Sequence, residues 1–392
     1  MIGKIFPSEM RQYTDPKSGR TITQLTQTGL NDHMYFTDNS FDLDGQEIYF
    51  VSNRANKGNF FNIFKMDLTT GQMVQLTDEP LGVQFTAFTK SPDSELIAYK
   101  TGNSIKVLNT RTGKTTLIYT EKGMMSFGQI HISPDKTTIG FARNELVGPE
   151  RDGKVMDLAA NYDGFFDKLF AIKDGRISTV YVDGSDFKDV YYDTHWLGHF
   201  QFSPDDSSIA MFCHEGPWNH VHQRIWVLDL NTGRPIPVFR QGPDDCVGHE
   251  YWTRSGDIVF DNRRAGHDGT ISSNKTQVYA REEQMKEGQI PYFGFARRDG
   301  EVYRTIEMPF HCNHYHSNND DSVFVGDGVE DLYLIRPKEE GATLEVLAEH
   351  NTTWKYHRSH CHPTFSWQGD SILYAADYDE EHGNLFLIRD VY

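Results

Sequence analysis

The chain has 392 residues, of which 38% are hydrophobic and 13% aromatic, and its 38 Lys and Arg against 56 Asp and Glu give a formal net charge of −18. This deficit of positive charge excludes a protein that binds nucleic acid or an anionic membrane surface mainly through lysine and arginine. The apolar content is too high for an intrinsically disordered chain, and four cysteines are too few for a disulfide-stabilised scaffold.

The N-terminal segment, residues 1–20, is polar and contains Pro7 and Pro16, so it lacks the apolar stretch of a secretory signal peptide. No other segment approaches the ~18 consecutive apolar residues that a membrane-spanning helix needs. The four cysteines lie far apart in the sequence, and we expect reduced, partly buried thiols. These features predict a cytoplasmic protein that does not associate with membranes.

One sequence module recurs along the whole chain. Its first half is a turn rich in Ser, Pro, Asp or Gly followed by a short apolar strand, as in SPDSELIAYK at 91–100. Such turns beside alternating apolar strands are typical of antiparallel hairpins. Seven copies of this first half are present, at residues 41–52, 91–100, 133–142, 203–212, 254–260, 317–326 and 367–376.

The second half of the module is a strand, a Gly-containing turn and a further strand, as in IFKMDLTTGQMVQLT at 63–77. It recurs at residues 105–119, 177–192, 225–239 and 332–348, and more weakly near 293–308. The last copy, at 385–392, lacks its final strand. The N-terminal segment RTITQLTQTG at 20–29 resembles the missing piece, so we expect it to complete the last copy.

Repeats of roughly 40–50 residues built from four strands are typical of β-propeller blades. The sequence therefore predicts an all-β, seven-bladed β-propeller that forms one domain over residues 1–392, with the N-terminal strand closing the C-terminal blade. Two separate β-sandwiches are the alternative, but no linker or change in composition divides the chain. The longest insertion, at 144–176, is expected to carry a short helix over one face.

The histidines are concentrated in the second half of the chain, where 14 of the 17 lie between His195 and His362. The densest group is YHRSHCHPTF, with His357, His360 and His362. If His360 and His362 are two apart on a strand, both point to the same side and face the channel. His314 comes one blade earlier. Three or four converging imidazoles predict a divalent transition metal such as Mn, Fe, Co, Ni or Zn, whereas solvated loop histidines are the alternative.

Two further segments contain residues with catalytic potential. CHEGPWNHVHQRIW at 213–226 contains His214 and Arg224, and CVGHEYW at 246–252 contains His249. Arg224 is interpreted either as a clamp for a bound anion or as a structural partner of an acidic loop. His249 is a candidate general base, because an imidazole titrates near neutral pH.

Over nearly its whole length the chain resembles the oligogalacturonide lyases of polysaccharide lyase family 22, which are cytoplasmic seven-bladed propellers. Several motifs carry this resemblance, and they are specific for the family in combination although no single one is. The resemblance is strongest at NDHMYFTDNSF (31–41), WLGHFQFSPDD (196–206), CHEGPW (213–218) with Arg224, GHEYW (248–252), HYHSNNDDSVFVGDG (314–328) and HCHPTFSWQGD (360–370).

The resemblance implies a Mn²⁺ site formed by three histidines and one glutamine. The histidines correspond to His314, His360 and His362. The glutamine position corresponds to His357, so the sequence departs from the family pattern there and metal preference is open. Another divalent transition metal is the alternative to Mn²⁺.

The resemblance also implies roles around the substrate. The family's general base falls on His249 and its substrate-binding arginine on Arg224. His199, in Trp-Leu-Gly-His, matches a family position and is expected to face the channel. His214 is expected to assist at substrate hydroxyls or at the leaving group.

The implied reaction is β-elimination of short oligogalacturonides, as in pectin degradation, giving a product with a 4,5-unsaturated uronate. The partner would be a small acidic oligosaccharide, with no nucleic acid and no membrane. A lyase for another uronic-acid oligomer and a non-catalytic propeller that serves as a binding module are the alternatives. The histidine cluster favours an enzyme, because a scaffold does not need it.

Overall fold

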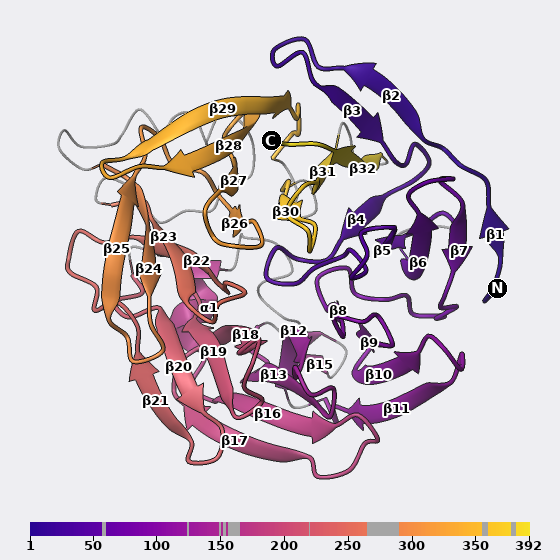
Figure 1. Cartoon of the computed structure of the whole chain (residues 1–392). Helices are drawn as coiled ribbons and strands as arrows, with labels where there is room; N and C mark the ends of the chain where they lie inside the picture. The colour runs from indigo at the N-terminus through magenta and orange to yellow at the C-terminus, as the bar shows by residue number, and fades with distance from the viewer. Residues whose placement is uncertain are drawn as a thin grey trace.

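The computed structural model is a ring of seven β-sheets arranged around a common centre (Figure 1). This confirms the predicted all-β, seven-bladed propeller. The structure describes residues 1–56, 60–123, 125–148, 150–151, 154–155, 165–218, 220–264, 290–354, 360–377 and 382–392.

Each of the first three blades contains four strands that pair antiparallel in chain order from the centre outwards, and in blade 3 the separate hairpin of β14 (Glu150–Arg151) and β15 (Lys154–Val155) intervenes between the second and third strands. Blade 1 contains β4 (Asn31–His33), β5 (Glu47–Ser52), β6 (Asn62–Asp67) and β7 (Met73–Gln75), with β1 (Ile5–Phe6) added at its outer edge. Blade 2 contains β8 (Phe88–Lys90), β9 (Leu96–Thr101), β10 (Ser104–Asn109) and β11 (Thr115–Thr120). Blade 3 contains β12 (Met125–Ile132), β13 (Thr138–Glu145), β16 (Gly175–Tyr181) and β17 (Lys188–Asp193).

The next three blades follow the same plan. Blade 4 contains β18 (Leu197–Phe202), β19 (Ile209–His214), β20 (Ile225–Asp229) and β21 (Arg234–Pro237). Blade 5 contains β22 (Val247–Trp252), β23 (Ile258–Asn262), β24 (Tyr292–Ala296) and β25 (Val302–Glu307). Blade 6 contains β26 (Tyr315–Ser317), β27 (Phe324–Asp327), β28 (Asp331–Pro337) and β29 (Ala342–Glu349).

Blade 7 joins the two ends of the chain. Its C-terminal strands are β30 (Thr364–Phe365), β31 (Ile372–Asp377) and β32 (Gly383–Ile388), and its outer strands are β3 (Thr21–Gln24) and β2 (Arg11–Thr14). β3 pairs antiparallel with β32, from Ile22 opposite Ile388 to Gln24 opposite Phe386. The prediction that the N-terminal strand closes the last blade is confirmed, and the closure pairs an edge of β32 that would otherwise be exposed.

The recurring turns have a local chemical cause. In the turn before β9, the Ser91 hydroxyl donates to the carboxylate of Asp93 at 2.6 Å, and the same bond recurs in the turns that begin at Ser133 and Ser203. Short polar side chains that bond two residues along the chain stabilise tight turns. Each Ser-Pro-Asp segment therefore ends an inner strand and reverses the chain into the second strand of its blade.

The core lies between blades. Phe50 and Phe64 of blade 1 share a buried cluster with Leu373 and Leu385 of blade 7. Because apolar burial stabilises a fold roughly in proportion to area, each blade depends on its neighbours in the ring for much of its stability.

The long insertion forms the hairpin β14 (Glu150–Arg151) and β15 (Lys154–Val155) and the helix α1 (Phe165–Ala171). The predicted short helix is therefore confirmed. It lies over the start of blade 4, where the Lys168 ammonium is 4.6 Å from the ring centre of Trp196.

The innermost strands of the blades, β4, β8, β12, β18, β22, β26 and β30, surround the centre of the ring (Figure 1). One prediction about them is wrong: His360 and His362 do not lie on a strand, because β30 begins only at Thr364. His362 has a left-handed backbone conformation, with φ of 44°, which interrupts the alternation of an extended strand. The two histidines still meet, but through an irregular segment.

Candidate active site and metal centre

Three histidines from two neighbouring blades converge at the centre of the ring. His314 directly precedes β26, and His360 and His362 precede β30. All three are buried, and one ring nitrogen from each lies within 4.8 Å of the others. We call this group the histidine triad. The sequence-based expectation that these side chains meet is consistent with this geometry.

The histidine triad fits a divalent transition metal. His314 Nδ1 lies 2.7 Å from Asp327 Oδ2, and the His314 amide donates to Asp327 Oδ1 at 2.6 Å. These bonds orient the ring and leave Nε2 buried with no hydrogen-bond partner among the described residues. A carboxylate behind an imidazole is the usual support of a metal-ligating histidine. Burial also lowers the pKa of His314 well below its ordinary value, which keeps a lone pair available.

Blade 1 supports the segment that carries His360 and His362. His33 Nε2 lies 3.2 Å from the carbonyl oxygen of Cys361, between the two histidines. The Tyr35 ring packs edge-on against the His362 ring at 4.7 Å. Sequence reasoning assigned neither His33 nor Tyr35 a role, although both lie in the conspicuous segment NDHMYFTDNSF. The fourth predicted ligand, His357, lies outside the described residues.

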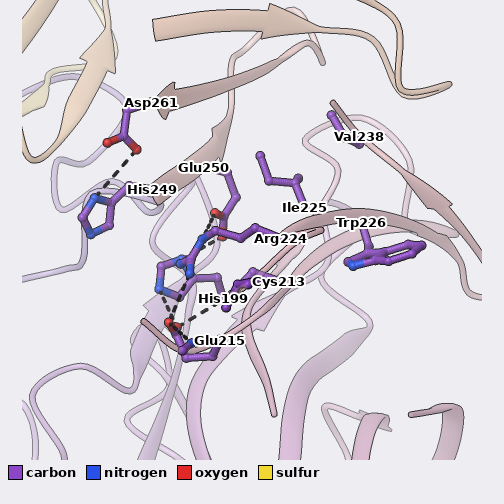
Figure 2. A network of polar contacts seen from close by, with 12 residues as sticks. His199, Cys213, Glu215, Arg224, Ile225, Trp226, Val238, His249, Glu250 and Asp261 are labelled. Atoms are coloured by element: carbon purple, nitrogen blue, oxygen red, sulfur yellow. Dashed lines mark hydrogen bonds and ion pairs between the residues drawn. The ribbon is translucent and has the colours of Figure 1, made fainter. Parts of the chain in front are cut away.

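His249, the predicted general base, lies on β22 beside the triad. Its ring centre is 4.3 Å from that of His314, and the Trp218 and Phe36 rings pack edge-on against it at 5.3 and 5.5 Å. His249 Nδ1 faces Asp261 Oδ1 at 4.0 Å (Figure 2). Burial, followed by the neighbouring His314, lowers the pKa of His249 well below its ordinary value. The imidazole is therefore neutral at neutral pH and able to accept a proton.

Arg224 lies in a buried ion-pair network. Its Nε donates to Glu250 Oε2 at 3.0 Å and its Nη1 to Glu215 Oε1 at 3.2 Å (Figure 2). The residue is only 1% exposed. This geometry matches the structural interpretation of Arg224, because two carboxylates surround one guanidinium. Arg224 in turn lowers the pKa of Glu215, against the effect of burial, to about 2.

His199 lies between the same two carboxylates. Its Nδ1 is 2.8 Å from Glu250 Oε1 and its Nε2 is 3.5 Å from Glu215 Oε2, although the Nδ1 contact lacks the angles of a hydrogen bond. The ring lies nearly parallel to that of His249, with centres 6.2 Å apart. His199 therefore connects the arginine network to the predicted base.

His214 has different neighbours. Its Nε2 is 3.3 Å from Asp193 Oδ2, and its ring stacks on that of His195 at 4.2 Å. Asp193, His195 and His214 form their own group of potential ligands. The contacts described for His214 are thus with blades 3 and 4 rather than with the histidine triad.

Acidic residues hold the site together, and sequence reasoning missed them. Asp261 lies near the end of β23 and Asp327 at the end of β27, which are equivalent second strands of blades 5 and 6. Aligning the sequence repeats could have identified both residues, because each Asp is the fourth residue of the second strand of its blade. Asp261 also contacts His311 Nε2.

A second buried cation, Arg263, adjoins these residues. Its Nε donates to His311 Nδ1 at 2.7 Å, and its guanidinium lies over the Trp218 ring at 5.3 Å. Its charge also contributes, after burial, to the lowered pKa of His314. The positive charge of Arg263 therefore acts electrostatically on His314, a member of the histidine triad.

No helix in the described part of the chain is long and apolar enough to span a membrane.

Two solved structures share the fold. An oligogalacturonate lyase in complex with manganese matches with a TM-score of 0.83 and 24% identity, over 99% of this chain and 98% of that one. An oligogalacturonate lyase from Vibrio parahaemolyticus also matches with a TM-score of 0.83, at 21% identity over the same shares of the two chains. Both support the seven-bladed propeller.

Sequence comparison identifies the family. An oligogalacturonate lyase from Dickeya dadantii is 24% identical over 402 residues, covering 96% of this chain and 95% of the relative. An oligogalacturonide lyase from Pectobacterium atrosepticum is 23% identical over 401 residues, with the same coverage. The sequence model of the oligogalacturonate lyase family matches residues 1–390. The chain therefore belongs to the oligogalacturonate lyase family.

Proposed function

We propose that this protein cleaves short oligogalacturonides by β-elimination, in a reaction that depends on Mn²⁺ or a similar divalent metal. The observation that carries the proposal is the position of His249, a neutral imidazole with only 16% of its side chain exposed, whose ring lies 4.3 Å from that of His314. A proton acceptor thereby adjoins a group of three potential metal ligands. Family membership supports the substrate class.

The bond to be broken determines what the site must supply. The C5 proton of a galacturonate is α to a carboxylate and only weakly acidic, so its removal requires stabilisation of the negative charge that develops. A metal held by His314, His360 and His362, with His357 as the proposed fourth ligand, would neutralise the substrate carboxylate as a Lewis acid. His249 takes the C5 proton, the C4–C5 double bond forms and the C4–O4 bond breaks. The neighbouring sugar leaves with O4, which is protonated by solvent.

The surroundings of His249 indicate which nitrogen accepts the proton. Nδ1 faces the carboxylate of Asp261 at 4.0 Å, so Nε2 is the atom that we assign to the substrate. Trp218 and Phe36 pack against the ring and limit its contact with water, so that 16% of the side chain is exposed. A dry setting strengthens every electrostatic interaction in the transition state.

The charge balance explains why a metal is needed. Arg224 is paired with both Glu215 and Glu250, so this group of three carries no net positive charge. An anionic substrate approaching an acidic protein needs a local excess of positive charge. The metal and Arg263 are the proposed sources.

We assign supporting roles to the remaining predicted residues. Arg224 uses Nε and Nη1 for its two ion pairs, and we propose that Nη2 binds a substrate carboxylate. His199, beside His249, would bind a neighbouring hydroxyl. We also propose that His214, at the end of β19, binds substrate at a position farther from the histidine triad. We place the enzyme in the cytoplasm, where its four buried free thiols would remain reduced.

The test is direct. Digalacturonate is incubated with the protein and Mn²⁺, and the ultraviolet absorbance of the unsaturated uronate product is followed. We expect a rise that a chelator abolishes and that added Mn²⁺ restores. Dimers of other uronic acids, including glucuronate, serve as controls for the substrate. Absence of product from every uronate dimer, with any divalent metal, would overturn the lyase assignment.

A further inference from the structure

A cavity of about 320 Å³ lies at the other end of the inner strands from the histidine triad. The inner strands all run in the same direction, and the triad precedes β26 and β30. The cavity is instead lined by residues at or just after strand ends, including Lys90, Phe202, Trp252 and Trp367. At about 3.3 Å per residue, the end of β22 at Trp252 lies roughly 10 Å along the strand from His249. We call this the distal cavity.

Lys90 is the unusual residue of the distal cavity. It is the last residue of β8 and is only 3% exposed, yet its Nζ has no hydrogen-bond partner among the described residues. The rings of Tyr49 and Trp367 lie 5.8 Å from Nζ. Burial lowers the pKa of Lys90 to about 8, so the amine remains largely protonated at neutral pH. A buried ammonium without a hydrogen-bond acceptor is costly, and an anionic ligand in the cavity would relieve that cost.

The same cavity presents hydrogen-bond acceptors without partners. Asp38 Oδ2 and Gln201 Oε1 are buried and accept no hydrogen bond from the described residues. The charge of Asp38 raises the pKa of Lys90 and so opposes the larger effect of burial, although the two side chains do not form an ion pair. A ligand that satisfies all three groups needs an acceptor for Lys90 and donors for Asp38 and Gln201. A negatively charged acceptor makes the strongest bond to Lys90, and hydroxyl groups are suitable donors.

The walls of the cavity are aromatic. Trp252, Trp367 and Phe202 line it. At its rim the exposed Arg254 lies over the Trp367 ring at 5.0 Å and donates to the Trp367 carbonyl at 2.5 Å. Aromatic walls with a few converging polar groups are typical of small-molecule sites of this size. They suit the apolar face of a sugar ring, and Arg254 adds positive charge at the entrance.

We propose that the distal cavity is a second ligand site that binds a monouronate, with its carboxylate on Lys90 and its hydroxyls on Asp38 and Gln201. The location of the site rests on the cavity and its unsatisfied polar atoms. The choice of a uronate rests also on the proposed function, since monouronates are the smallest fragments of the proposed substrate. The site is separate from the metal centre, so it binds ligand without the histidine triad.

Calorimetric titration of galacturonate into the Mn²⁺-loaded protein and into His314→Ala tests this proposal. We expect His314→Ala to retain one galacturonate site. Lys90→Met in the same background should weaken that site about tenfold or more, as expected when one charge-assisted hydrogen bond is lost. Lys114→Met, at an exposed lysine, is the matched control and should leave the affinity unchanged. Lys90→Gln replaces Lys90→Met if that variant does not fold.

Three results would overturn the proposal. The first is that His314→Ala does not bind galacturonate. The second is that the affinity is unchanged in the folded Lys90 variant. The third is that neutral galactose binds with equal affinity. Turnover of digalacturonate is measured on the same wild-type preparation. Turnover without distal binding defeats only this inference, whereas binding without turnover defeats only the proposed lyase function.

Discussion

The ring of His249 lies 4.3 Å from the ring of His314, although the two residues come from different blades and are 65 positions apart in the chain. We propose that His249 accepts a proton and that His314, whose Nε2 is buried with no hydrogen-bond partner among the described residues, binds the metal. Their contact places proton removal and charge stabilisation next to each other, as β-elimination requires. The two functions reside on separate side chains, so mutation should separate them.

Replacement of the base should remove turnover and spare the metal. We expect His249→Ala to lower kcat by about 10²–10⁴-fold, the usual contribution of a general base. Manganese content should stay stoichiometric, because His249 is not a member of the triad. Turnover is measured by absorbance and metal by elemental analysis on one preparation. Loss of metal in His249→Ala would show that the residue is a ligand.

Replacement of a member of the histidine triad should remove both turnover and bound metal. His360→Ala is expected to lose bound manganese and turnover together, because two imidazoles hold a divalent ion far less tightly than three. His382→Ala, at an exposed histidine outside each group of potential metal ligands in the described part of the chain, is the control and should keep its metal. Stoichiometric metal in His360→Ala would contradict the ligand assignment.

Asp327 should act through His314. Asp327→Asn keeps the shape of the side chain but weakens the bond to His314 Nδ1, which is 2.7 Å long in the structure. We expect metal affinity to fall about 10–100-fold, as for other residues that support a metal ligand. Competition with a chelating dye measures the affinity. Turnover at saturating Mn²⁺ should largely recover, and a persistent loss would place Asp327 in the chemistry itself.

Removal of the Arg224 guanidinium should destabilise the fold. Arg224→Ala leaves the fully buried Glu250 and the largely buried Glu215 without their cation, and loss of a buried partner typically costs about 3–5 kcal/mol. Urea unfolding measures the change. The exposed Arg234 provides the control, since Arg234→Ala should change stability by less than about 0.5 kcal/mol. A small effect at Arg224 would show that water reaches the network.

Removal of the Lys90 charge should stabilise the protein in a pH-dependent way. Burial lowers the pKa of Lys90 from 10.5 to about 8, so the folded state binds the proton less tightly than the unfolded state. Below pH 8 the charged amine then costs on the order of 3 kcal/mol. This cost declines as the pH rises from 8 towards 10.5, because the folded state releases its proton first.

We therefore expect Lys90→Met to unfold at a higher urea concentration than wild type at pH 7, and the difference to shrink by pH 10. Lys114→Met should show no such trend. A difference that is independent of pH would mean that the effect is one of packing rather than charge.

The propeller could be predicted because its causes are local. Turns such as that of Ser91 and Asp93 bond over two residues, and alternating apolar positions define each strand without reference to the rest of the chain. Repetition then determines the number of blades. The meeting of His314 with His360 and His362 could also be anticipated, because successive blades bring equivalent loops together.

The partners of those residues were not predictable in the same way. His33 supports the carbonyl of Cys361 across 328 positions, and Arg224 bonds Glu250 across 26. The segment of His360 and His362 was expected to be a strand, but a left-handed residue at His362 turns the chain there. Such contacts depend on how neighbouring blades stack and how their side chains pack. Neither can be predicted from a local sequence pattern.

The sequence by itself determined the class of fold, the closure by the N-terminal strand and the residue types that converge at the centre, because strand alternation and turn chemistry are encoded over a few neighbouring residues. Only the tertiary structure decided that two glutamates surround Arg224, that Asp327 orients His314, and that Lys90 Nζ is buried beside a cavity with no hydrogen-bond partner among the described residues. Charge and hydrogen bonding act through space over a few ångströms, and those neighbours exist only once the ring has closed.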